Sequence, residues 1–306
     1  MNFYTDNRPY DVYLIGRYFS DLIFTKLPEM PRLGHEVYAR CFHIVLGGVA
    51  TPAIALTRLG LRVAWPCAFG SDVFSRHVKQ LVLDEGVDSS LFKDTDHPLL
   101  ALSVAFSFEK ERAFLSYADD HPEFDHADHL HTVKPKWLYV TNLHTLPKLQ
   151  EIVAAAREVG AHILMDCQAH HHHISDPQIT SALRMVDVFT LNEEEARVLT
   201  GEPDSPQALE TLTQYVHTVI IKRGASGCIC RQGNEIISID ALPVTVVDTT
   251  GAGDNFNCGF LLGQLRDFTL AQSLRAGIIC GSLSVQGYGG ASTSPTLDEL
   301  LVYMSS

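Results

Sequence analysis

The sequence predicts an α/β protein with a mainly parallel central sheet. From residue 137 onward, short apolar runs alternate with helical segments, and this order is typical of parallel strands joined by helices. A second observation is the segment 244–265, in which an apolar, β-branched run is followed by a glycine-rich turn and then by an apolar stretch. We interpret this segment as a strand, a tight turn and the start of a buried helix.

In the first part of the chain, glycines and capping residues mark the expected elements. Buried strands are expected over 12–16 and 62–69. A helix between them ends before Gly60. Thr51 is its expected N-cap and Pro52 its first helical residue, because these residue types favour those positions.

Two pairs of short β-like runs interrupt this β/α order. The runs are 22–24, 36–42, 99–108 and 112–116. The charged residues 109–111 are expected to form a hairpin turn within the second pair. We therefore expect one domain over residues 1–306, with two insertions at about 20–43 and 97–117.

The remaining elements follow the regular alternation. The expected strands are 137–141, 162–165, 186–191, 219–223, 228–231 and 235–239, and the expected helices are 70–86, 146–159, 256–265 and 270–286. Gly160 is a suitable helix stop. The acids at 193–195 are suited to the first turn of another helix, where negative charge is favourable.

The composition limits the class of protein. The formal net charge of -13 disfavours a nucleic-acid or anionic-membrane surface, which needs a basic patch. The seven cysteines are scattered without a CxxC pair, which favours a reduced, cytoplasmic protein. The N-terminal segment lacks the apolar core of a signal peptide. The uncharged run 276–297 is too rich in Gly, Ser and Thr for a membrane span.

The turn Gly-Ala-Gly-Asp at 251–254 has the features of an anion-binding site. Glycines let the backbone approach a ligand closely. The free N–H groups of the first helical turn and the helix dipole together attract anions. Asp254 in this turn is either a helix-capping residue or a base held beside a phosphate, and the turn alone favours neither reading.

Other phosphate-binding motifs are excluded. The chain contains no GxxxxGK[ST] string, and a dinucleotide fingerprint would need a third glycine where Phe256 stands. The HRD and DFG strings of protein kinases are also absent.

The string DTTGAGD at 248–254 resembles the signature of the ribokinase-like (PfkB) carbohydrate and nucleoside kinases. The resemblance covers nearly the whole chain. It implies a three-layer α/β/α fold in which the two insertions form a small β-sheet lid that often makes a homodimer contact. It also implies that Asp254 is the catalytic base, and that the amides of Gly251, Ala252, Gly253 and Asp254 bind the transferred phosphoryl group.

The resemblance places the substrate near the N-terminal part of the chain. Asp21, five residues after Gly16, matches a family aspartate that binds sugar hydroxyls; the alternative is a turn-forming aspartate. Gly47 and Gly48 match a glycine pair of the substrate site. The family has an asparagine after this pair, where this chain has Pro52. One polar contact is therefore lost, and the identity of the substrate stays open.

The resemblance also implies how ATP and Mg²⁺ are held. Asn192 and Glu195 match an N-x-x-E motif that organises Mg²⁺ and the phosphates, largely through water, and oxygen ligands suit this ion. The nucleotide is expected against the turn that contains Lys222, Gly224 and Gly227.

Two further contacts follow from the same resemblance. Thr250, Gly251 and Gly253 are expected to contact ATP. The residues around Asp248 and Thr250, with the loop 287–292, are expected to bind a monovalent cation such as K⁺.

Two segments rich in metal-ligating side chains match no standard metal site. Residues 119–131 contain four aspartates and four histidines. Their spacing fits no common ligand pattern, so a solvated linker is favoured over a metal site. The run His170–His173 follows an expected strand end. The family often has an arginine here, matched by His170, but an exposed loop is the favoured interpretation of the run.

The sequence thus predicts ATP-dependent phosphorylation of a hydroxyl on a sugar or sugar-like substrate, of the ribokinase or fructokinase type. An adenosine-type nucleoside kinase, a vitamin-precursor kinase and a non-catalytic sugar- or nucleotide-binding regulator are the alternatives. The intact Asp254 argues against the regulator. No nucleic-acid or membrane partner is expected.

Overall fold

The computed structural model describes residues 8–108, 112–143, 149–168 and 172–305. Within these ranges the main sheet has the strand order β14-β13-β12-β11-β10-β9-β1-β4. Its strands are β1 (Val12–Ile15), β4 (Val63–Ala64), β9 (Trp137–Val140), β10 (His162–Asp166), β11 (Val188–Asn192), β12 (Thr218–Lys222), β13 (Cys228–Gln232) and β14 (Glu235–Ile239). The neighbours from β4 to β12 pair in parallel, and β13 and β14 add an antiparallel edge.

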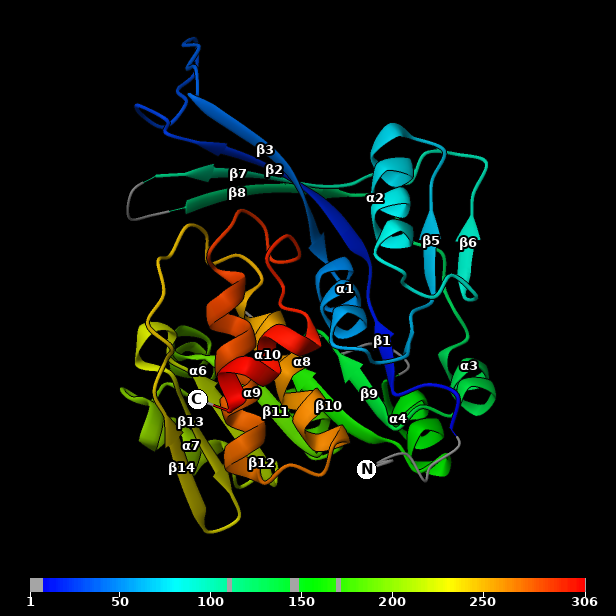
Figure 1. Ribbon diagram of the computed structural model, residues 1–306, viewed down its shortest axis with the longest axis vertical. Helices are drawn as coiled ribbons and strands as arrows, with labels where there is room; N and C mark the ends of the chain where they lie inside the picture. The colour runs from blue at the N-terminus through cyan, green and yellow to red at the C-terminus, as the bar shows by residue number, and fades with distance from the viewer. Residues whose placement is uncertain (1–7, 109–111, 144–148, 169–171, 306) are drawn as a thin grey trace.

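Helices cover both faces of this sheet, so the predicted α/β class and its three layers are confirmed (Figure 1). One face packs against α1 (Ala50–Arg58), α8 (Ala252–Leu265), α9 (Leu270–Ser284) and α10 (Leu297–Met304). The other packs against α3 (His126–Val133), α4 (Leu149–Glu158), α5 (Pro177–Leu183), α6 (Glu193–Thr200) and α7 (Ser205–Leu212). Successive residues of each strand point to opposite faces. Accordingly, Trp137 and Tyr139 join one apolar cluster, and Leu138 and Val140 join the other.

Helices α8 and α9 pack unusually closely, because glycines remove side chains from their contact. A Cβ atom added to Gly259 would lie 2.5 Å from the carbonyl oxygen of Ala276. One added to Gly263 would lie 2.6 Å from Ser273 Oγ. Both distances are shorter than van der Waals contact, so only glycine fits at these two positions. This packing holds α8 inside the protein with its N-terminus near the carboxyl ends of the parallel strands.

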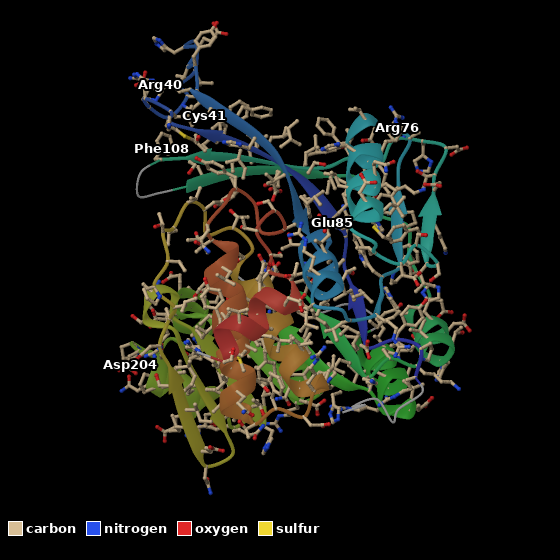
Figure 2. All side chains as sticks on the ribbon, in the orientation of Figure 1. Arg40, Cys41, Arg76, Glu85, Phe108 and Asp204 are labelled. Carbon is tan, nitrogen blue, oxygen red and sulfur yellow. The ribbon has the colours of Figure 1, made fainter. Side chains whose placement is uncertain are left out.

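A second, four-stranded sheet lies across the loops that follow the main strands (Figure 1). It contains β2 (Tyr18–Thr25), β3 (Cys41–Gly48), β7 (Ala101–Ser107) and β8 (Arg112–Ala118), in the order β3-β2-β7-β8. We call it the lid sheet. Figure 2 shows Arg40, Cys41 and Phe108 at its free end, away from Arg76 on α2 (Val73–Asp84). A separate two-stranded sheet pairs β5 (Cys67–Phe69) with β6 (Phe92–Asp94).

Several expected element boundaries are wrong. The strand expected over 62–69 divides into β4 and β5, which belong to different sheets. The β-like run 36–42 becomes a strand only from Cys41. The valine-rich segment 244–247 is not a strand but part of a loop.

The predicted cap of α1 is also wrong. The N-cap is Val49, without a side-chain hydrogen bond, and Thr51 lies inside the helix. Thr51 is buried, and its methyl group faces the glycines at 251 and 290. Packing therefore decides its place rather than capping. Pro52 lies in the first turn of α1 and is also buried.

None of the helices in the described part of the chain combines the length and the apolar character that a membrane crossing needs. The hairpin turn expected at 109–111 lies outside the described residues.

Candidate active site

The start of α8 is built on one residue that must be glycine. Gly251 is the N-cap, with a left-handed φ of 72°, a conformation that other residues rarely adopt. A Cβ atom here would lie 2.5 Å from Gly290 Cα. The Asn255 amide donates to the carbonyls of both Gly251 and Gly290, at 2.9 and 2.8 Å. These contacts fix the turn against the 287–292 loop. The Ala252 amide donates to the carbonyl of Thr249 at 3.3 Å, and the amides of Gly253 and Asp254 lie in the first turn, where the helix itself supplies no acceptor.

Asp254 is the third residue of α8 and does not cap it, because Gly251 is the N-cap and no side chain caps this helix. The capping interpretation of Asp254 is therefore wrong. Tyr139 Oη donates to its Oδ1 at 3.4 Å. Burial, and then the nearby charge of Asp166, raise the pKa of Asp254 to about 7, although Lys222 acts in the opposite direction. A carboxyl with a pKa near neutrality is well matched to accepting a proton.

A network of buried polar groups lies directly behind Asp254. Asp166 ends β10, and both of its oxygens contact Lys222 Nζ, at 3.0 and 3.1 Å. Thr190 Oγ1 donates to Asp166 Oδ1 at 2.9 Å. Asn257 Nδ2 donates to Asp166 Oδ2 at 2.9 Å and to Tyr139 Oη at 2.8 Å. Asn257 thus links Asp166 directly to Tyr139, which is the hydrogen-bond donor to Asp254.

The sequence interpretation missed most of this network. The sequence predicts that Lys222 contacts ATP, but it indicates no role for Tyr139, Asp166, Thr190 or Asn257. Asp166 does carry a signal, since it ends a strand of a parallel sheet, where ligands of such folds gather. The other three look like ordinary core residues in the sequence.

A groove of about 370 Å³ runs along the start of α8. On one side lies the turn that contains Lys222, Gly224 and Gly227. The opposite wall is the loop 241–249, and the floor is formed by α8 and α9. The unexpected loop conformation of residues 244–247 therefore builds a wall of this groove. Three expected ATP contacts (Lys222, Gly224 and Gly227) line it together, and so does Gly253.

Asn192 and Glu195 lie close to this groove but bond mainly to each other. Asn192 Oδ1 accepts from Glu195 N, and Glu195 Oε2 accepts from Asn192 N, each at 2.8 Å. This reciprocal pair is a capping box at the start of α6. Glu195 nonetheless contributes to the electrostatic environment of both Lys222 and Asp254. Any contact with Mg²⁺ through water fits this arrangement better than direct coordination.

Asp21 lies on β2 of the lid sheet, so its interpretation as a turn residue is wrong. A Cβ atom on Gly47 would lie 2.2 Å from Asp21 Oδ2, so the carboxylate occupies the space that a side chain would need. Burial, and then the charge of Asp248, raise the pKa of Asp21 to about 7. Gly48 has a φ of 58° and turns the chain toward α1. The structure thus brings Asp21 close to Gly47.

Asp248 joins two loops beneath the lid sheet. Its Oδ1 accepts from Thr250 N and Thr250 Oγ1, at 3.0 and 2.8 Å, and its Oδ2 accepts from Gly289 N at 2.9 Å. The two residues expected at the monovalent-cation site are therefore in contact. Asp248 lies close enough to Asp21 to affect its pKa, and both Asp248 and Thr250 line a small pocket with residues of the lid sheet. The lid sheet therefore lies next to the turn that begins α8.

The two histidine-rich segments have different outcomes. Residues 126–133 form α3, with Asp125 as its N-cap, so the expected linker is wrong for that part. His126 and His129 contact Tyr13 Oη. Among the described residues, no three metal-ligating side chains form a cluster that could hold a metal ion. His170 lies outside the described residues.

Comparison with known proteins decides the family. Residues 12–297 match the PfkB family of carbohydrate kinases. The chain belongs to this family. It is therefore a carbohydrate kinase of an ATP-using family. The match extends across both sheets and includes the signature turn.

Individual relatives agree with this assignment. The chain is similar to a ribokinase of Haemophilus influenzae, with 28% identity over 95% of this chain and 97% of the relative. It is also similar to a fructokinase of Salmonella typhimurium, with 26% identity over 83% of this chain and 90% of the relative. Among solved structures, an Arabidopsis thaliana ribokinase complexed with ribose and ATP has a TM-score of 0.83 at 21% identity and covers 97% and 99% of the two chains. This last similarity concerns the fold.

The raised pKa of Asp254 predicts a cost in stability at neutral and alkaline pH. Its pKa is 3.8 ordinarily and about 7 when folded. Between these values the folded protein holds a proton that the unfolded chain releases, so the free energy of unfolding falls as the pH rises. We expect Asp254→Asn to melt at a higher temperature than the native protein at pH 8, with the difference shrinking toward pH 4.

Thermal unfolding followed by circular dichroism between pH 4 and 8 measures this effect. Asp240→Asn removes the same formal charge at an exposed position and serves as the control, with little expected change. A lower melting temperature for Asp254→Asn at pH 8 would contradict the assigned burial cost.

Proposed function

We propose that this protein transfers the γ-phosphoryl group of ATP to a hydroxyl of a sugar or sugar-like substrate, of the ribokinase or fructokinase type. The observation that carries the proposal is the position of Asp254. This half-buried carboxyl, with its pKa near 7, lies in the first turn of α8, beside the groove and near the lid sheet that carries Asp21. A base and an anion-binding turn thus meet where a hydroxyl and a phosphate would meet.

The geometry supports the following roles. Asp254 would orient the substrate hydroxyl and accept its proton. The amides of Gly251, Ala252, Gly253 and Asp254 would stabilise charge on the transferred group, because helix N-termini favour anions. Such transfer depends mainly on positioning and electrostatics, so few side chains suffice.

The nucleotide would lie in the groove, with its phosphates toward Gly253 and its base between the 224–227 turn and the loop 241–249. Thr250 would contribute at the phosphate end. Mg²⁺ bound with ATP would neutralise charge on the phosphate oxygens. Asn192 and Glu195 would hold its water ligands, since their own side chains already bond each other's backbone.

On the substrate side, Asp21 would bind sugar hydroxyls, with Gly47 and Gly48 leaving room beside it. We also propose that residues 1–306 act as one kinase domain in the cytoplasm, and that Asp248 and Thr250 belong to a K⁺ site. All seven cysteines are free thiols, which agrees with a reducing compartment.

A coupled ADP-release assay over sugars and nucleosides with Mg-ATP tests the function. We expect turnover of a sugar. Asp254→Asn should lower kcat by about 10²–10⁴, the usual contribution of a positioned acid or base, while ATP still binds. Near-native turnover by this variant would refute Asp254 as the base. A nucleoside preferred over every sugar would favour the adenosine-type alternative.

The Mg²⁺ dependence tests Glu195. Glu195→Gln keeps an acceptor for Asn192 N, so the capping box survives and only the charge is lost. We expect the Mg²⁺ concentration for half-maximal rate to rise by about tenfold, as for other outer-shell changes, with the KM of the sugar unchanged. Glu194→Gln is the matched control, because Glu194 is exposed in the same helical turn and pairs with Arg197. Equal Mg²⁺ requirements in all three proteins would reduce Glu195 to a helix-capping residue.

We further propose a homodimer through the outer face of the lid sheet. Strand register puts Phe42, Ile44, Leu115 and Tyr117 on the face opposite to Ile23, which lies next to the active-site loops. These four apolar side chains are exposed, Leu115 to 68%. An exposed apolar surface of this kind marks an interaction site.

We expect Leu115→Asp to convert a dimer into a monomer, because a carboxylate would be buried without a partner. Sedimentation velocity measures the change. Val302→Asp, at an exposed apolar residue of α10, is the control and should leave the association state unaltered. A monomeric native protein, or a dimer that survives Leu115→Asp, would rule out this interface.

A further inference from the structure

Lys222 occupies an unusual place for a lysine. It is the last residue of β12, and its side chain reaches across to the first turn of α8. A Cβ atom added to Gly253 would lie only 3.0 Å from Lys222 Nζ. The ammonium group therefore lies against the backbone of the turn that attracts anions. The side chain is 13% exposed and lines the groove.

The charges around this group are mainly negative. Burial alone would lower the pKa of Lys222, but Asp166, Glu195 and Asp254 outweigh it, and the pKa is raised. The lysine therefore keeps its proton at neutral pH. Among the described residues that line the groove, Lys222 is the only charged one. An incoming polyphosphate would meet this cation beside the α8 amides.

A purely structural ion pair explains the contact with Asp166 less well. Asp166 already accepts hydrogen bonds from Thr190 Oγ1, Asn257 Nδ2 and the backbone N–H of Cys167. Its oxygens would stay satisfied without the lysine. Buried ion pairs are also weak contributors to stability, because desolvation offsets their attraction. Burying the Lys222 ammonium group therefore costs free energy of desolvation, and binding of an anionic ligand in the groove would explain why the group is there.

We propose that Lys222 is a catalytic residue that contacts the transferred phosphoryl group, and that Asp166 positions it; this rests on the proposed kinase function. In the step, the substrate hydroxyl oxygen bonds to the γ-phosphorus while the bond to the bridging oxygen breaks. The electron pair leaves on ADP, and the hydroxyl proton goes to Asp254. Lys222 keeps its own protons and donates hydrogen bonds to the γ-phosphoryl oxygens, where charge is concentrated.

A contact with the γ-phosphoryl group and a contact with the rest of the nucleotide predict different effects of a Lys222 substitution on kcat and on nucleotide affinity. Lys222→Met should lower kcat by about 10²–10³, the range for loss of one preorganised donor. It should weaken binding of the non-hydrolysable analogue AMP-PNP with Mg²⁺ by about tenfold or more, since a charged hydrogen bond is lost. The Kd of ADP, which lacks the γ-phosphoryl group, should not change.

The matched control is Lys136→Met. Lys136 is 11% exposed and pairs with the buried Asp11, at 3.1 Å, at the start of β1 and β9. This second lysine–aspartate pair lies at the opposite end of the strands from the site. Its loss should lower the melting temperature but leave kcat and both nucleotide affinities unchanged. If Lys222→Met does not fold, Lys222→Gln, which retains a hydrogen-bond donor without the charge, undergoes the same measurements.

Asp166→Asn tests the positioning role. The amide keeps one acceptor oxygen, replaces the other with a donor and no longer carries the charge that attracts the cation, so kcat should fall while the Kd of ADP stays constant. Calorimetry with AMP-PNP and ADP separates the proposal from the function beneath it. A native protein that binds neither nucleotide would refute the kinase function. Native-like kcat and AMP-PNP affinity in a folded Lys222 variant, with the native protein active, would overturn the role of Lys222 alone. An equal loss of ADP and AMP-PNP affinity would instead make Lys222 a general nucleotide contact.

Discussion

The close packing of α8 on α9 is the constraint on which the rest of the site depends. Gly259 and Gly263 bring the two helix backbones together, and α8 is then buried along most of its length. A buried helix has little freedom to slide or rotate, because protein interiors are packed like crystals. Its first turn is therefore fixed relative to the ends of β9, β10 and β12. Tyr139, Asp166, Lys222 and Asp254 come from these four elements, so the geometry of this part of the site follows from the packing.

That same burial makes the charges of the site expensive. Asp254 and Asp166 lie near each other inside the protein, and both cannot be ionised without compensation. Lys222 supplies one positive charge, and the neutral donors Asn257 and Tyr139 supply hydrogen bonds. Burial raises the pKa of Tyr139 well above its usual range, so its hydroxyl stays a donor. As a result, the pKa of Asp254 is about 7, a value that a fully solvated aspartate does not have.

The local parts of this design were predictable from the sequence, and the long-range parts were not. The glycine turn at 251–254 that begins a helix, and the acids at 193–195 in the first turn of another helix, are local features, and the structure contains both. The prediction that Thr51 caps α1 is wrong because Thr51 packs against Gly251 and Gly290, and this packing outweighs its preference for the N-cap position. The strand expected at 244–247 is wrong because the valines of this segment, two of them exposed, favour a strand only by composition. Asn257 could not be found, since its partners lie 91 and 118 residues away.

The two carboxyls with raised pKa values lie on different parts of the fold, and this difference matters for catalysis. Asp254 is held by helix packing, so its environment is fixed before any ligand arrives. Asp21 is on the lid sheet, which meets the body through the loops around Asp248 and Tyr288. Its environment therefore depends on how closely the lid sheet covers those loops. With a pKa of about 7, the carboxyl of Asp21 is partly protonated at neutral pH and can both donate and accept hydrogen bonds, which suits a sugar hydroxyl. In the proposed mechanism, Asp254 as a rigid base and Asp21 as a substrate-binding acid on a separate sheet would allow the substrate to be enclosed without disturbing the group that accepts its proton.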